Sequence, residues 1–206
     1  MRLYIFIGVA AAAILSFAAA DSRECSDKLA NIVINLNGPF FTKDQIIRII
    51  DDMGTMYLQG TPLADICRYL RNSQSTYCTT EQINIVADIT KQINQIIGSS
   101  ERTAQLFNIS FSEALSFISA DQRELDQLIA TEKAQGLDTD TLKRDMCRFI
   151  ISKYTQEKRV EMAKRILGYV TPEHRVQIRN LLGSVIKLDG IDINDVGTTP
   201  AGFQGF

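Results

Sequence analysis

The sequence predicts an all-α protein with one compact domain of about nine or ten helices. The chain has 206 residues, of which 45% are apolar and 22% charged, with only four prolines and twelve glycines. This composition is typical of a folded domain and not of a disordered or fibrous chain. A short pattern typical of helix starts occurs four times. Apolar residues follow these starts at helical spacing, without the alternation that is typical of strands.

The first 20 residues have the features of a cleaved secretory signal. One basic residue, Arg2, precedes the apolar run 3–17, and three alanines at 18–20 stand before Asp21. The alternative, a membrane anchor, requires roughly 20 apolar residues, which is more than this run offers. We therefore expect a secreted, extracellular protein without stable membrane insertion. Its mature part would be a helical domain at 21–189 and a flexible tail at 190–206, where periodicity is lost.

The repeated pattern is an aromatic residue, an apolar residue or cysteine, Ser or Thr, any residue, an acid, and Gln or His. The hydroxyl can accept hydrogen bonds from the free amides of the first helical turn, and Gln three residues later can complete a capping box. The acid between them favours the positive end of the helix dipole. Four helix starts are therefore predicted, capped by Thr42, Thr79, Ser119 and Thr171.

The elements are expected in the following order. A first helix at 26–36 ends before Gly38 and carries a narrow apolar stripe, which predicts a peripheral position. The helices after Thr42 and Thr79 carry wide isoleucine-rich stripes that are typical of central helices, and Gly98 ends the second of them. Further helices are expected at 62–71 with Thr61 as cap, at 139–154, at 156–167 with Thr155 as cap, and from Pro172 onward.

Four cysteines form an even set: Cys25, Cys67, Cys78 and Cys147. In a secreted chain, such a set favours two disulfides over a metal site or a catalytic nucleophile. Three pairings are possible. We slightly favour Cys67 with Cys78, because they flank the short polar connection 71–76, which leaves Cys25 with Cys147.

The sequence contains no signature of a catalytic or cofactor site. It has no zinc-protease or nucleophile-elbow motif, no phosphate-binding loop and no dinucleotide fingerprint. The single histidine, His174, stands where a cap partner is expected. We therefore expect a protein that is not an enzyme and that uses no cofactor or metal. The sequon at Asn108 predicts an exposed glycosylation site.

Charge is distributed unevenly along the chain. Region 143–187 holds eleven basic and four acidic residues, whereas region 21–142 holds ten basic and seventeen acidic ones. The two regions can pack together with complementary charge, or the basic one can bind an anion such as a lipid carboxylate, a phosphate headgroup or a sulfated polysaccharide. Nucleic acid is not expected, because the chain is acidic overall. The basic candidates are Lys158, Arg159, Lys164, Arg165, Arg175 and Arg179.

The segments SFISADQREL at 116–125 and YVTPEHR at 169–175 contain the third and fourth helix starts. They resemble the helix-opening repeats of nematode fatty-acid- and retinol-binding proteins. The resemblance implies a secreted, all-helical and often glycosylated protein that encloses an apolar cavity for fatty acids or retinoids.

Two functions follow as hypotheses. In the first, which the resemblance favours, the protein is a lipid carrier whose wide stripes surround a pocket, and a basic residue holds the acid group of the ligand. In the second, the stripes fill a solid core and region 143–187 contacts a receptor or a polyanion. The pocket candidates are Ile46, Ile50, Met53, Ile89, Ile93 and Phe149, and the anion-binding candidates are Lys164, Arg175 and Arg179.

Overall fold

The computed structural model describes residues 21–192, 196 and 205–206, so the expected signal segment lies outside the described residues. All regular structure in the described residues is helical, which confirms the all-α prediction. The ten helices of the described residues are α2 (Asp21–Asn37), α3 (Lys43–Leu58), α4 (Leu63–Asn72), α5 (Gln74–Tyr77), α6 (Thr80–Ile97), α7 (Ser100–Ala120), α8 (Gln122–Ala134), α9 (Thr139–Lys153), α10 (Gln156–Gly168) and α11 (Pro172–Leu182).

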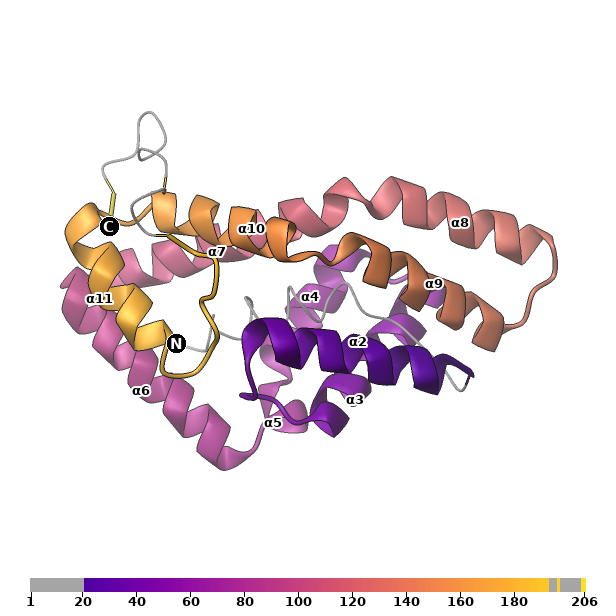
Figure 1. Ribbon diagram of the computed structural model, residues 1–206, viewed down its shortest axis with the longest axis horizontal. Helices are drawn as coiled ribbons and strands as arrows, with labels where there is room; N and C mark the ends of the chain where they lie inside the picture. Colours follow the sequence, from indigo (N-terminus) through magenta and orange to yellow (C-terminus); the bar gives the residue numbers. More distant parts are fainter. Residues whose placement is uncertain (1–20, 193–195, 197–204) are drawn as a thin grey trace.

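The helices form one domain around a continuous hydrophobic core. Helix α2 packs along α9 and α3, while α8 and α9 form an antiparallel pair (Figure 1). At the other end of the molecule, α10 lies beside α7 and α11 packs against α6 (Figure 1). The core reaches from α2 to α11, so the two ends belong to a single domain.

Helix α2 buries one face against α3 and α9, while Glu24, Lys28 and Asn31 on its other face are exposed, which is the pattern of a helix at the surface of the domain. Its residues Leu29, Ala30 and Val33 are 0%, 0% and 1% exposed. The stripe of large apolar residues underestimates the buried face, because that face also contains the small residues Ala30 and Ser26. Small side chains allow close approach of the neighbouring helices α3 and α9.

The first two predicted helix starts are confirmed as capping boxes. Thr42 Oγ1 accepts from the backbone amide of Gln45, whose side-chain oxygen accepts from the amide of Thr42 at 2.9 Å. Thr79 and Gln82 repeat this arrangement at the start of α6. Helix α6 ends as predicted at Gly98, whose φ of +75° suits a residue without a side chain.

The two capping boxes are also bonded to each other. The side-chain amide of Gln45 donates to the carbonyl oxygen of Tyr77 at 2.8 Å, and that of Gln82 donates to the carbonyl oxygen of Phe40. The two glutamine side chains bond one another, with Nε2 of Gln45 donating to Oε1 of Gln82 at 2.7 Å. Each glutamine thus bonds to the aromatic residue that begins the repeated pattern of the other helix start. These bonds hold the starts of α3 and α6 together.

The third and fourth predicted starts differ from the expectation. Ser119 caps no helix, because α7 continues to Ala120 and α8 follows directly with Asp121 at the junction. Thr171 does precede α11, with Pro172 in the first turn, but its side chain makes no capping hydrogen bond. The hydroxyl of Thr171 and Nδ1 of His174 are both buried without a hydrogen-bond partner among the described residues. Histidine does not reproduce the glutamine of the first two boxes.

Two helices were not among the expected elements. The long helix α7 starts at the cap Ser99, which accepts from the backbone amide of Arg102 at 3.3 Å. The short helix α5 occupies part of the polar connection between Cys67 and Cys78. In addition, α4 begins one residue later than expected, with Pro62 and not Thr61 at its cap position.

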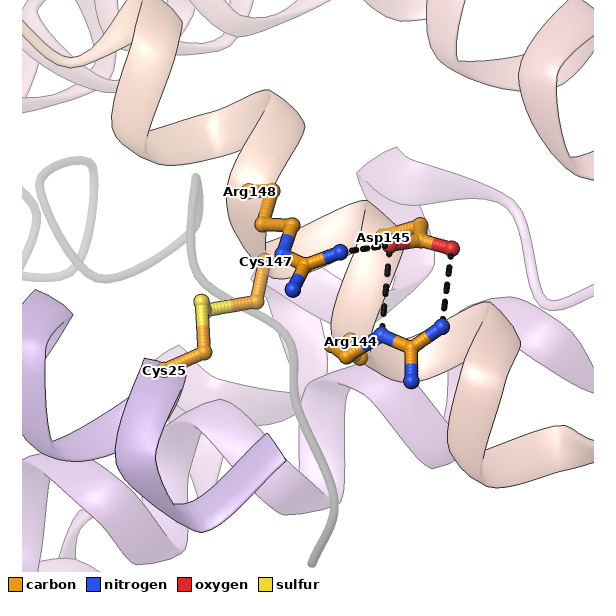
Figure 2. Close-up of a disulfide and its surroundings, with 5 residues drawn as sticks. All are labelled: Cys25, Arg144, Asp145, Cys147 and Arg148. Carbon is orange, nitrogen blue, oxygen red and sulfur yellow. Dashed lines mark hydrogen bonds and ion pairs between the residues drawn. A yellow bond between two sulfur atoms is a disulfide. The ribbon is translucent and has the colours of Figure 1, made fainter. Parts of the chain in front are cut away.

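One disulfide, between Cys25 and Cys147, joins α2 to α9 (Figure 2). Their Cα atoms are 6.3 Å apart although the residues are separated by 122 positions in the chain. The bond therefore fixes the contact between α2 and α9, which pack against each other.

The expected second disulfide is not formed, since Cys67 and Cys78 are free thiols. Cys67 lies on the buried face of α4, and Cys78 ends α5 as a partly buried residue against the core. Because α5 is helical, the connection does not form the simple loop that a disulfide was expected to close. Burial raises the pKa of each thiol to about 12, so both are protonated at neutral pH.

Only part of the expected tail at 190–206 is described. Ile191 and Val196 form a small apolar cluster with Leu167 of α10. Phe206 is 2% exposed, and its backbone amide donates to the carbonyl oxygen of Tyr169 at 2.8 Å. These described tail residues are packed against the domain.

Candidate ligand cavity

A cavity of about 150 Å³ lies between α6, α7, α10 and α11. Its walls are mostly apolar because each of these helices turns part of its hydrophobic stripe toward the same space. The apolar wall residues include Ile93, Leu106, Phe107, Met162, Ile178 and Leu182. The volume is below the range of roughly 300–1,000 Å³ that is usual for pockets of drug-sized ligands. Any ligand part that fits inside is therefore small.

The irregular segment 183–192, which we call the strap, closes one side of this cavity. Its apolar residues Ile186, Leu188 and Ile191 belong to the walls. The backbone amide of Lys187 donates to the carbonyl oxygen of Asn37 at 2.9 Å, which ties the strap to the end of α2. The strap thus takes the place of a further helix over the open side of the four-helix arrangement.

Arg159 of α10 holds the strap from inside. Its guanidinium is buried and donates to the carbonyl oxygens of Lys187 and of Asp189, the latter at 3.2 Å. Its Nε donates to the side-chain oxygen of Asn37 at 3.2 Å, and the amide of Asn37 donates to the hydroxyl of Tyr154 at 2.7 Å. Burial lowers the pKa of Arg159 and raises that of Tyr154 to about 12. This network fixes the strap through backbone oxygens, which substitution of the strap side chains would leave in place.

An open groove of about 530 Å³ lies on the outer side of the strap. It shares four residues with the cavity, so the two spaces adjoin at Arg179, Ile186, Lys187 and Leu188. Gly38, whose φ is +90°, lines the groove. A Cβ atom added at this position would lie 3.4 Å from the backbone nitrogen of Lys187. The cavity is mostly apolar, whereas the lining of the groove is polar and apolar in similar parts.

Of the three predicted anion-binding residues, only Arg179 lies in the cavity wall. Its Nε is buried and has no hydrogen-bond partner among the described residues. Arg175 is buried on α11, and its Nε donates to the carbonyl oxygens of Leu167, in the last turn of α10, and of Val170 at 2.9 and 2.8 Å. Lys164 is on α10 but not among the described wall residues.

Of the six predicted pocket residues, Ile93 lines the cavity. Phe149 is half-buried, with Lys153 Nζ 5.1 Å from the centre of its ring. The other four, Ile46, Ile50, Met53 and Ile89, are buried in the hydrophobic core and are not among the walls described for this cavity. The helical pattern identified their buried faces correctly, but most of those faces meet other side chains.

Several basic residues of region 143–187 are paired with acids of the preceding region. Lys143 contacts Asp51 at 3.0 Å, and Lys153 contacts Glu124 at 2.6 Å. Lys158 pairs with Asp121. These contacts agree with the interpretation in which the oppositely charged regions pack together.

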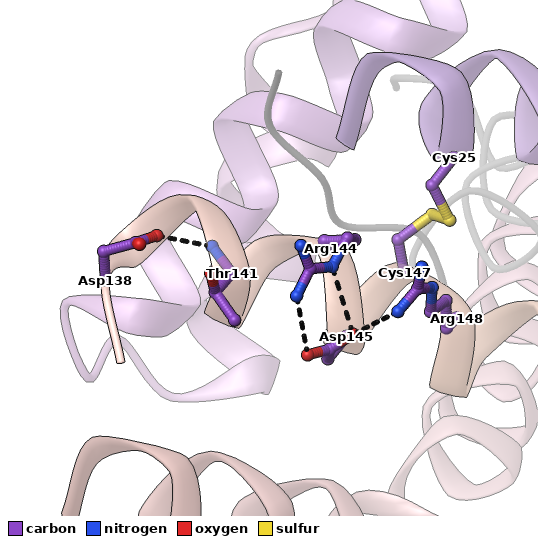
Figure 3. Close-up of polar contacts among 7 residues, drawn as sticks. All are labelled: Cys25, Asp138, Thr141, Arg144, Asp145, Cys147 and Arg148. Atoms are coloured by element: carbon purple, nitrogen blue, oxygen red, sulfur yellow. Dashed lines mark hydrogen bonds and ion pairs between the residues drawn. A yellow bond between two sulfur atoms is a disulfide. The ribbon is translucent and has the colours of Figure 1, made fainter. Parts of the chain in front are cut away.

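Other basic residues have partners within their own helix. On α9, Asp145 contacts Arg144 at 3.4 Å and Arg148 at 2.9 Å (Figure 3). On α10, Arg165 contacts Glu161 at 2.8 Å. These basic side chains therefore take part in separate ion pairs within α9 and α10.

Asn37, the structural role of Arg159 and the strap were not predicted from the sequence. The available signal was the apolar spacing of Ile186, Leu188 and Ile191 directly after the end of α11. The predicted glycosylation residue, Asn108, is exposed on α7.

Within the described residues, no helix is both long and apolar enough to cross a membrane. The same part of the chain contains no group of three or more His, Cys, Asp or Glu side chains placed to hold a metal ion. No protein-family model matches the sequence, and no curated protein or solved structure is significantly similar to the chain.

Proposed function

We propose that the protein is a secreted, non-enzymatic carrier that binds a small apolar ligand in the cavity between α6, α7, α10 and α11. The observation that carries this proposal is the mostly apolar cavity with a few polar groups at its edge. Concave apolar sites with a few orienting polar groups are the usual form of small-molecule sites. The strap completes the site, since it supplies one wall of the cavity.

The alternative function, contact of the basic region with a receptor or polyanion, has less support. Arg159 and Arg175 are buried, and Lys158 pairs with Asp121. A polyanion site needs several exposed cations with no competing acids nearby. The contacts described above give these side chains structural partners instead.

Calorimetric titration with octan-1-ol tests the carrier function. We expect saturable binding to the native protein, and loss of that binding in Ala163→Phe, whose ring would fill the cavity. The matched control is Ala87→Phe at an exposed position of α6. Circular dichroism would establish that both variants are folded. Binding that is absent from the native protein, or equal in both folded variants, would contradict the proposal.

A further inference from the structure

Arg179 is placed at the boundary between the apolar cavity and the outer groove. Its Nε is buried and has no hydrogen-bond partner among the described residues. A buried donor without a partner is costly, whereas a bound acceptor at this position would satisfy it. The side chain is therefore suited to receive a polar group whose apolar remainder extends into the cavity.

The two neighbouring buried arginines differ in this respect. Arg159 donates to carbonyl oxygens of the strap, and Arg175 of α11 donates to the carbonyl oxygens of Leu167 and Val170. The protein supplies acceptors to both of them. Arg159 and Arg179 are the arginines that line the cavity or the groove. Of these two, Arg179 has a buried Nε without an acceptor among the described residues, so a bound ligand would have to supply that acceptor.

The charges at this boundary favour an anion. Lys187 lines both spaces with Arg179, and its Nζ donates to the carbonyl oxygen of Asn35 at 3.1 Å, an acceptor without net charge. The acid that lines the groove is Asp189, and its field acts on the neighbouring Arg159. The edge of a guanidinium offers two parallel donors, which match the two oxygens of a carboxylate.

The volume limits the apolar part of the ligand. A mostly apolar cavity of about 150 Å³ accommodates a molecule of the size of benzene. We infer that the ligand is a monocarboxylate with roughly six to eight carbon atoms, held by its carboxylate at Arg179 and with its chain in the cavity. This inference rests on the proposed carrier function, and it names the class of ligand that the same site would take.

The inference predicts how affinity depends on chain length. From butanoate to octanoate, each added methylene is buried in the cavity and should increase the affinity about fourfold. Beyond octanoate, the added carbons have no further apolar space and the affinity should level off. Calorimetric titration with butanoate, hexanoate, octanoate and dodecanoate, below their micellar concentrations, measures this series. A steady increase through dodecanoate would overturn the size limit.

Comparison of octanoate with octan-1-ol tests the head group separately. In Arg179→Gln, octanoate affinity should fall by at least about tenfold while octan-1-ol affinity stays unchanged, because only the carboxylate uses the charge. Lys164→Gln is the matched control, since it removes a basic residue of α10 that is not among the cavity walls. Arg179→Lys, which keeps the charge without the paired donors, should show a partial loss and serves if the glutamine variant does not fold.

The outcomes separate the inference from the proposed function. If octan-1-ol binds but octanoate binds no better and Arg179→Gln changes neither, the cavity is a ligand site and the role of Arg179 is wrong. If neither compound binds the native protein, the carrier function and the inference are both wrong.

Discussion

The carboxylate of Glu132 on α8 is buried, and its Oε2 has no hydrogen-bond partner among the described residues. Burial raises the pKa of this group, and the nearby Asp145 raises it further, against the opposing effect of Arg144. The folded state therefore binds the proton more tightly than the unfolded chain does. It follows that the protein loses stability as the pH rises through the raised pKa of Glu132.

Glu132→Gln should raise the thermal midpoint by a few degrees at pH 7, because it removes a buried charge while keeping the shape of the side chain. The difference should vanish below the ordinary glutamate pKa of about 4.3, where both proteins are neutral at this position. Thermal unfolding by circular dichroism between pH 4 and 8 measures this. Glu101→Gln, at an exposed position of α7, is the control. A lower midpoint for Glu132→Gln at pH 7 would refute the assignment.

At the scale of helices, local signals were sufficient where both partners of a capping box are present. Thr42 and Thr79 could be predicted as caps because the donors and acceptors involved are within three residues. Ser119 shows the limit of this inference, since the strong continuation of α7 overrides a cap signal inside it. The bonds between Gln45 and Gln82 could not be foreseen, because they depend on how α3 and α6 approach each other.

The glutamine pair predicts coupling between the two helix starts. Gln45→Ala and Gln82→Ala should each lower the free energy of unfolding by about 1–2 kcal/mol, because each leaves backbone groups without a partner. The double variant should lose less than the sum, by about 1 kcal/mol, since the second substitution removes bonds that the first has already broken.

Urea unfolding of the native protein, the two single variants and the double variant measures this cycle. Gln92→Ala, at an exposed position of α6, is the control and should change the stability little. Strict additivity of the two substitutions would contradict direct coupling.

At the scale of the whole molecule, the sequence predicted which faces are buried but not what they meet. Ile50 fills the core and Ile93 lines a cavity, although both belong to wide stripes on central helices. Periodicity reports only that a side is shielded from water, whereas a cavity depends on the fit between several helices and the strap. The location of Arg179 at its edge could be proposed from charge, but its separation from Lys164 and Arg175 required the fold.

The disulfide between Cys25 and Cys147 should contribute about 4–5 kcal/mol to stability, because it closes a loop of more than a hundred residues in the unfolded chain. The double variant Cys25→Ser with Cys147→Ser should unfold at correspondingly lower urea concentration. Cys67→Ser serves as a comparison at a cysteine outside the disulfide. Equal midpoints for the native protein and the double variant would contradict this structural role.

The order in which the chain is synthesised gives this disulfide a further consequence. Cys25 leaves the ribosome 122 residues before Cys147, a delay of roughly 6–24 seconds at ordinary rates of elongation. If the chain is secreted, as proposed, the other thiols of the chain that Cys25 can meet during that interval are Cys67 and Cys78. Early docking of α4 and α5 would shield those two sulfurs, so the first helices to fold would protect the nascent protein from mispaired oxidation.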